Sequence, residues 1–155
     1  YVSSQDLLAG CEHFDVFTIN NYSMNAAEEV ERVGRMTGLP VIVGEFHFGA
    51  LDRGMISTGL KGVPNQEERG KAYKYYVENT AANGYCIGTH YFVLNDQAFL
   101  GRRDGENYQI GLVDVCHKPY EEFIKGIMET HKTIYEVAEG RKEKYAIPPM
   151  EIPRN

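Results

Sequence analysis

Short apolar runs alternate with longer helical patterns along this chain, and this alternation limits the folds open to it more than any other feature. The apolar runs cover residues 14–20, 41–46 and 85–93, and each is followed by a segment with helix caps or helical spacing of apolar residues. Strands that alternate with helices form crossover units, which make neighbouring strands parallel. The sequence therefore predicts an α/β fold built on parallel strands.

Side chains typical of helix ends mark where two of the intervening helices begin. Asn25 suits the N-cap of a helix over residues 26–37. Asn65, with Glu68 three residues later, resembles a capping box that opens a second helix running to about residue 82. Both predicted helices begin in the connections that follow a predicted strand.

The last part of the chain divides into a helix and a proline-containing segment. Pro119 suits the first position of a helix that Gly140 would end, and apolar residues recur at helical spacing between them. Residues 142–155 carry three prolines and are expected to be extended. We therefore predict one α/β unit over residues 1–141 and an extended tail over 142–155.

Composition argues against several classes of partner. The 155 residues carry a net charge of −6, whereas binding to a nucleic-acid backbone needs a basic face. No apolar run approaches the ~20 residues of a membrane span. No G-x-G-x-x-G or P-loop motif follows a predicted strand, so we expect no nucleotide or other cofactor. Cys11, Cys86 and Cys116 lie far apart without metal-ligand spacing, and we interpret them as buried free thiols.

Polar or aromatic side chains follow all three predicted strands at the point where each strand ends. They are Asn20, Asn21 and Tyr22 after the first strand, Glu45 and His47 at the second, and His90 and Tyr91 at the third. In parallel α/β folds, sites form at the carboxyl ends of the strands. Three such strand ends in succession therefore predict a binding or catalytic site.

Glu45 is the most informative of these residues because it ends a run of strand-forming residues. A strict period of two places Val41, Val43, Glu45 and His47 on one face of the strand. A carboxylate on a buried strand has to be paired, hydrogen-bonded or used in chemistry.

Two structural interpretations of Glu45 stay open beside a catalytic one. The first is an ion pair with an arginine. The candidate arginines are Arg53, Arg102 and Arg103. The second is a metal site in which Glu45 joins His47 and His90, although no i, i+4 histidine pair supports such a site.

The segment over residues 95–108 is too long and too polar for an ordinary connection. It combines planar hydrogen-bonding groups with aromatic rings, and sugars need both. The residues of this loop that we predict to contact sugar are Asp96, Arg102, Asp104 and Asn107. The alternative is a solvated surface loop held by its own arginine–aspartate pairs.

Several segments together resemble the C-terminal part of the clan A glycoside hydrolases. They are FTINNY, PVIVGEFHFG, THYF, DQAFLGRRDGENYQIGLVD and KPY, and the resemblance extends from about Phe14 to the last helix. These enzymes are retaining glycosidases on a (β/α)8 TIM barrel, and within the clan the chain looks most like the β-agarase and β-galactosidase-like families. The resemblance implies that the chain supplies barrel strands six, seven and eight.

The same resemblance implies roles for individual residues. Glu45 matches the nucleophile at the end of strand seven, and Tyr22 matches a strand-six tyrosine that hydrogen-bonds the nucleophile. The general acid/base of the clan, a glutamate after an asparagine at the end of strand four, has no counterpart in this chain. The tryptophan that usually ends strand eight is absent as well, and Tyr91 or Phe92 is the candidate to replace it.

We therefore interpret the chain as part of a retaining β-glycosidase that acts on oligo- or polysaccharides, either β-linked, galactose-containing glycans or a related β-glycan. Further sugar contacts are expected from Asn20, Asn21, His47, His90 and Tyr91. We expect no hydrolysis by this chain alone, because the general acid is missing. Its open sheet edges are expected to self-associate or to pair with the missing N-terminal barrel segment.

A secreted or periplasmic location suits an enzyme that degrades polysaccharides, although the chain shows no signal peptide. The alternative function is a non-catalytic α/β module that binds carbohydrate or a protein partner.

Overall fold

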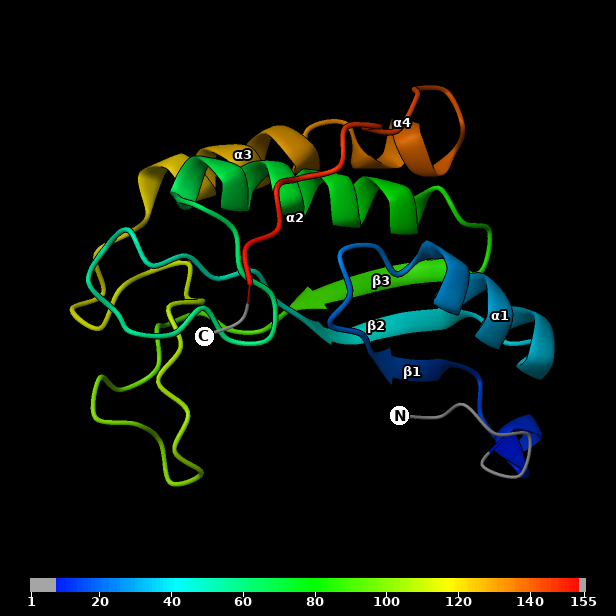
Figure 1. Cartoon of the computed structure of the whole chain (residues 1–155). Coiled ribbons are helices and arrows are strands. Elements are labelled where there is room, and N and C mark those ends of the chain that lie inside the picture. The colour runs from blue at the N-terminus through cyan, green and yellow to red at the C-terminus, as the bar shows by residue number, and fades with distance from the viewer. Residues whose placement is uncertain (1–7, 154–155) are drawn as a thin grey trace.

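The computed structural model describes residues 8–153, which contain a three-stranded parallel sheet in the order β1–β2–β3. The strands are β1 (Phe17–Asn20), β2 (Val41–Phe46) and β3 (Cys86–Tyr91), and the helices are α1 (Ala27–Thr37), α2 (Gln66–Ala81), α3 (Glu121–His131) and α4 (Ile134–Ala138). A short 3₁₀ turn, η2 (Cys11–His13), precedes the sheet. All three strands point in one direction, and α2 and α3 lie over the sheet (Figure 1). The predicted α/β fold with parallel strands is confirmed.

The core lies between the sheet and its helices, and β2 contributes most of the sheet side. Val41, Val43 and Phe46 are at most 1% exposed and belong to one apolar cluster with residues of α1, α2 and α3. The Phe46 ring stacks on Tyr76 of α2, with 4.2 Å between centroids and 4° between planes. Full burial of a large apolar side chain contributes about 1.5–3 kcal/mol, so these contacts hold β2 firmly against the helices.

A β-bulge in β2 changes the face on which Glu45 lies. Ile19 pairs with Val43 but Asn20 pairs with Glu45, so β2 has one residue more than β1 at this point. The bulge brings Phe46 onto the helix-covered face with Val43 and leaves Glu45 on the opposite face. The prediction that Glu45 shares a face with Val43 is therefore wrong, because one inserted residue inverts the alternation of every later side chain.

An asparagine side chain caps α2 as the sequence predicts, whereas the N-cap of α1 is Ala26 and Asn25 lies one residue before it. The Asn25 Oδ1 atom accepts a hydrogen bond from the Ala27 N–H at 2.9 Å, at the first residue of α1. The Asn65 Oδ1 atom accepts from the Glu68 N–H, also at 2.9 Å. The Glu68 carboxylate pairs with Lys71 at 2.8 Å, so Asn65 works as a simple N-cap rather than as half of a reciprocal capping box.

The single helix predicted between Pro119 and Gly140 is two helices in the structure. The interruption lies at Thr133, whose φ of −129° is not helical. Its carbonyl accepts from the Val137 N–H at 3.1 Å, and its hydroxyl accepts from Lys142 at 2.7 Å, so Thr133 begins α4. The prediction failed because a β-branched residue with local hydrogen bonds ends one helix and starts another without disturbing the apolar pattern.

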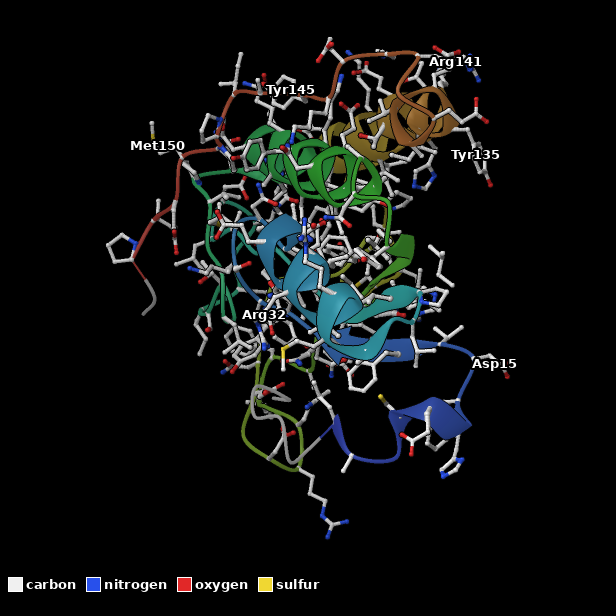
Figure 2. The ribbon with its side chains drawn as sticks, turned by 90° about the vertical axis from the view of Figure 1, so that its right-hand side faces the viewer. Asp15, Arg32, Tyr135, Arg141, Tyr145 and Met150 are labelled. Atoms are coloured by element: carbon white, nitrogen blue, oxygen red, sulfur yellow. The ribbon has the colours of Figure 1, made fainter. Side chains whose placement is uncertain are left out.

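The chain after α4 is extended and passes back along α2. The Tyr145 N–H donates to Glu78 Oε2 at 2.7 Å, and Asn79 donates to the Tyr145 carbonyl at 2.8 Å. Farther along, the Ile152 N–H donates to the Gly62 carbonyl at 2.9 Å, which joins the tail to the loop after β2. Figure 2 labels Tyr145, above α2, and Met150 farther along this segment, to the left of the helix.

No helix within residues 8–153 has the length and apolar character needed to cross a membrane. The three cysteines are free thiols, and Cys11 and Cys86 are partly buried. Cys116 is exposed, so the prediction of a buried thiol is wrong there. Its backbone N–H bonds to Asp114 Oδ1 at 2.8 Å, which holds Cys116 in a surface turn.

Candidate active site

The loops after β2 and β3 gather beyond the carboxyl ends of the strands, where the arrowheads point in Figure 1. This edge of the sheet carries most of the polar residues that the sequence singles out. Only some of them present their side chains at the surface, and the others form the framework of the edge.

Glu45 and Tyr22 form the central contact of this edge. The Tyr22 hydroxyl donates a hydrogen bond to Glu45 Oε2 at 2.6 Å. The Asn21 N–H donates to the Glu45 carbonyl at 3.0 Å, so the chain leaving β1 is tied to the end of β2 through both backbone and side chain. The expected hydrogen bond between the two side chains is therefore present.

The turn that carries Tyr22 is held by Asn21. The Asn21 Oδ1 atom accepts from the Ser23 N–H at 3.0 Å, and its carbonyl accepts from the Tyr76 hydroxyl at 2.8 Å. Asn21 is therefore engaged within the protein. Asn20 is exposed, and its Oδ1 atom would lie 3.0 Å from a Cβ at Gly44, so the glycine leaves room for it beside Glu45.

His47 is buried against Tyr22 instead of lying at the surface. Its side chain is 2% exposed, and its ring centroid is 4.7 Å from that of Tyr22. The Nε2 atom accepts a hydrogen bond from the Leu60 N–H at 2.9 Å. A direct contact between His47 and a sugar does not fit this burial.

The third strand places its two predicted site residues on opposite faces. Val43 pairs with Thr89 and Phe46 with Tyr91, so Tyr91 faces the helices and the exposed His90 faces the side of Glu45. The Tyr91 ring packs against Phe46, with 5.2 Å between centroids. Its hydroxyl lies 2.9 Å from the Phe48 and Ile110 carbonyls, which leaves it no access to substrate.

Unlike Tyr91, Phe92 lies on the same side of the sheet as Glu45. Its ring centroid is 6.3 Å from that of His47, and the guanidinium of Arg102 lies 5.9 Å from the centre of the Phe92 ring. The aromatic ring that lies near the site after the third strand is therefore that of Phe92, the residue that follows β3.

Arg69 on α2 organises the framework, although no sequence motif marks it. It is fully buried and donates to the Phe48 carbonyl at 2.8 Å, the Gly111 carbonyl at 2.8 Å and the Tyr91 hydroxyl at 3.0 Å. The guanidinium also lies 4.0 Å from the centre of the Phe123 ring. One side chain thus joins α2, α3 and the segments after β2 and β3. Its position within a strongly polar helix offered no signal of burial.

The loop over residues 95–108 contains a buried carboxylate and an exposed ion-pair cluster. Asp96 is 6% exposed, and its oxygens accept hydrogen bonds from the Gly111 N–H at 2.7 Å and from the Tyr120 hydroxyl. Burial raises the pKa of Asp96. Asp96 therefore belongs to the framework.

The exposed part of the loop contains ion pairs between its own residues. Arg102 pairs with Asp104 at 2.5 Å and with Glu106 at 2.9 Å. The hydrogen bond from Arg102 lowers the pKa of the Asp104 carboxyl. Asn107 is partly exposed on the same loop. These side chains lie at the surface, as both a sugar-contacting loop and a solvated loop would require.

Three loop carboxylates are the nearby candidates for a second catalytic acid, and each has a structural partner. Asp52 accepts from the Gln66 N–H at 3.1 Å and from the Gln66 side chain at 2.9 Å. Glu106 accepts from Gln97 at 2.8 Å and pairs with Arg102. Asp96 is buried as described. Glu45 differs from these three in its position at the end of the middle strand, where it is partly exposed and accepts from the Tyr22 hydroxyl.

The structural interpretations of Glu45 find no support among residues 8–153. No ion pair there involves Glu45, and Arg53 instead pairs with Glu122 at 2.5 Å. No group of three or more histidine, cysteine, aspartate or glutamate side chains in the described chain is arranged to hold a metal ion.

Comparison with known proteins relates the chain to β-agarases. No family model matches it. It is 33% identical over 129 residues to β-agarase B of Vibrio sp. (strain JT0107), a match that covers 79% of this chain and 13% of that protein. It is 34% identical over 107 residues to β-agarase A of the same organism, covering 68% of this chain and 10% of that protein.

A solved structure described as an exo-β-agarase superimposes with a TM-score of 0.80 at 35% identity, covering 85% of this chain and 18% of that one. The chain therefore spans 13% and 10% of the length of the two curated relatives. It is similar in sequence and in fold to one segment of these β-agarases.

Proposed function

We propose that this chain forms part of the catalytic barrel of a retaining β-glycosidase that cleaves β-linked, galactose-containing glycans of the agar type. Glu45 is its nucleophile, and Tyr22 orients it. The observation that carries the proposal is the 2.6 Å hydrogen bond from Tyr22 to a carboxylate at the carboxyl end of the middle strand. The similarity to a segment of β-agarases supports the substrate class.

The sheet supports the proposed barrel position. Three parallel strands in chain order, with helices against one face, suit strands six to eight of a (β/α)8 barrel. The outer strands leave edges, and apolar side chains near them are exposed, Ile87 of β3 to 58% and Phe14 before β1 to 67%. The remaining barrel segment would cover these edges, since exposed strand edges recruit further strands. A self-associated state of the isolated chain, measured as mass in solution, is the expected consequence.

Glu45 attacks the anomeric carbon, and the bond from that carbon to the leaving oxygen breaks as a glycosyl ester forms on Glu45. The leaving oxygen takes a proton from a carboxylic acid about 5 Å from Glu45, which another part of the enzyme supplies. Water, activated by the same group as base, then hydrolyses the ester. The Tyr22 hydroxyl, on Oε2, holds the carboxylate plane and leaves Oε1 to react.

Substrate contacts belong to the residues at the open face. His90 and Asn20 are exposed on the side of Glu45, and Phe92 offers an apolar face in place of tryptophan. Arg102, Asp104 and Asn107 form the rim. Four residues predicted from the sequence to contact sugar are left out of this set because they are engaged within the fold: Asn21, His47, Tyr91 and Asp96.

Trapping the intermediate tests the nucleophile. A polypeptide that carries this segment within its complete barrel is treated with a 2-deoxy-2-fluoro-β-galactosyl fluoride and digested. We expect the adduct mass on the peptide containing Glu45, and none in Glu45→Gln. An adduct on a different carboxylate would overturn the assignment. Sugar binding without turnover or adduct would favour the non-catalytic binding module.

A further inference from the structure

The loop after β2 folds back onto the strand end through His47. The Gly49 N–H donates to the Lys61 carbonyl at 2.8 Å, and the Val63 N–H donates to the Gly49 carbonyl at 2.9 Å, which closes the loop. Inside it, the Leu60 N–H donates to His47 Nε2 at 2.9 Å. Acceptance at Nε2 requires the neutral ring with its hydrogen on Nδ1, so this contact sets both the tautomer and the orientation of the imidazole.

Gly59 makes this approach possible. It has a φ of +72°, in the left-handed region, and a Cβ at this position would lie 2.6 Å from His47 Nε2. A side chain there would displace the imidazole or the loop. The close contact between the loop and the imidazole therefore depends on the backbone conformation of Gly59 and on its lack of a side chain.

The oriented His47 ring packs against the Tyr22 ring. Its centroid lies 4.7 Å from the Tyr22 ring and 6.0 Å from the Tyr108 ring. Tyr108 is itself fixed, because its N–H donates to Gln97 at 2.8 Å and the next N–H, of Gln109, donates to the Ser57 carbonyl at 2.8 Å. The loops after β2 and β3 therefore both hold the imidazole that packs against Tyr22.

We propose that His47 is a positioning residue, which holds the Tyr22 ring at the angle from which its hydroxyl reaches Glu45. The proposal deepens the proposed function, since it assigns the buried histidine to the alignment of the nucleophile. The physical reason is the steep dependence of a hydrogen bond on distance and angle, so a small rotation of the phenol ring would lose the 2.6 Å contact. Contact with sugar is not required.

Two substitutions separate the two contacts of the imidazole. His47→Gln keeps an acceptor near the position of Nε2 but removes the ring, whereas His47→Phe keeps a ring and removes the acceptor. Both are made in this chain, and no sugar is needed. The measurements are amide hydrogen exchange at Leu60 and the exchange of the Tyr22 hydroxyl proton, both by NMR, with Tyr22→Phe identifying the hydroxyl signal.

We expect the two substitutions to affect different exchange rates. In His47→Phe, Leu60 exchange becomes about five- to tenfold faster, as expected when one hydrogen bond is lost. In His47→Gln, Leu60 stays protected while the Tyr22 hydroxyl exchanges faster by a similar factor. Unchanged Tyr22 exchange in both folded variants would overturn the proposal, as would uniform loosening of all amides of β2, which would indicate a merely structural role.

Gly59→Ala keeps the proposal testable where the His47 variants fail to fold. The added methyl displaces the imidazole, so Tyr22 hydroxyl exchange should accelerate together with Leu60 exchange. Faster Leu60 exchange with an unaltered Tyr22 hydroxyl would contradict the proposal. Because these signals are read without turnover, their outcome is independent of the trapping experiment, and failure of one proposal is distinguishable from failure of the other.

Discussion

The Tyr22–Glu45 contact and the exposed loop cluster around Arg102 occupy the same edge of the molecule, yet they are held by different parts of the chain. Tyr22 and Glu45 are 23 residues apart and meet because two parallel strands end side by side. Arg102 finds Asp104 and Glu106 two and four residues farther along the same loop. The first contact depends on the whole sheet and the second on one short segment.

The difference has energetic consequences. Exposed ion pairs contribute roughly 0–1 kcal/mol, because water and salt screen them and two long side chains lose freedom. The framework behind Glu45 is buried, and a buried polar group left without its partner costs about 1–3 kcal/mol. Substitutions behind Glu45 should therefore reduce stability, whereas substitutions in the loop should affect function alone or nothing.

Loss of the Glu45 carboxylate should have the largest effect. In a polypeptide with the complete barrel, Glu45→Gln should lower hydrolysis of an aryl β-galactoside or an agar oligosaccharide by about 10⁴-fold or more, as for other nucleophiles. The melting temperature should stay nearly constant. Glu28→Gln, at an exposed glutamate of α1, is the control.

The same substitution can be tested in the isolated chain. It should show no turnover with or without Glu45→Gln, because leaving-group protonation typically supplies ~10²–10⁴-fold in rate and its donor lies elsewhere. Robust hydrolysis that Glu45→Gln abolishes would mean that this chain, or a second copy of it, provides the acid.

Removal of the buried arginine should have the next largest effect, on stability. Arg69→Met leaves the Gly111 carbonyl without its donor and removes the charged donors from the Phe48 carbonyl and the Tyr91 hydroxyl, so the free energy of unfolding should fall by about 3–4 kcal/mol. Urea denaturation of this chain measures it, with Arg35→Met on the surface of α1 as control. A loss below about 1 kcal/mol would show that Arg69 does not hold the strand ends together.

Tyr22→Phe should have an intermediate effect on rate. It removes one hydrogen bond to a charged group, worth about 1.5–3 kcal/mol, so kcat in the complete barrel should fall by about 10- to 100-fold. KM should change little, because the hydroxyl orients the nucleophile and does not hold sugar. Tyr135→Phe, at a tyrosine of α4 that is 78% exposed, is the control. An equal fall in kcat in Tyr22→Phe and Tyr135→Phe would contradict a specific role of Tyr22 in orienting the nucleophile.

Arg102→Gln should have the smallest effect on stability. Arg102 lowers the pKa of Asp104, so the stability of this pair is present at neutral pH and is lost as pH falls through that lowered pKa. The melting temperature at pH 7 should change very little, while glycan affinity of the complete enzyme falls. Arg103→Gln is the neighbouring control. A large drop in melting temperature with unaltered affinity would favour a purely structural loop.

Much of the architecture could be predicted because it depends on local patterns. The strand over residues 41–46 has the bounds expected from its composition, and Asn25 and Asn65 bond the helix ends that their types favour. The expected Tyr22–Glu45 hydrogen bond is present as well. Parallel strands bring their carboxyl ends to one edge of the sheet, so the residues at those ends gather on the same side of the molecule.

Side-chain placement was harder to predict because it depends on single residues elsewhere. His47 and Tyr91 are polar or aromatic residues at strand ends, as a site requires, yet both have their side-chain contacts inside the fold. Nothing adjacent in the sequence distinguishes them from the exposed His90. Their partners, Leu60 for His47 and Arg69 for Tyr91, lie 13 and 22 residues away.

By itself the sequence determined the alternation of strands and helices as far as the last helical region, the parallel sheet and the edge at which a site forms, since periodicity and caps act over a few residues. Only the tertiary structure decided which face carries Glu45, which aromatic ring lies near the site after the third strand, and which histidine is buried. The reason is the bulge opposite β1: one extra residue, specified by the pairing of two strands, inverts the direction of Glu45 and of Phe46.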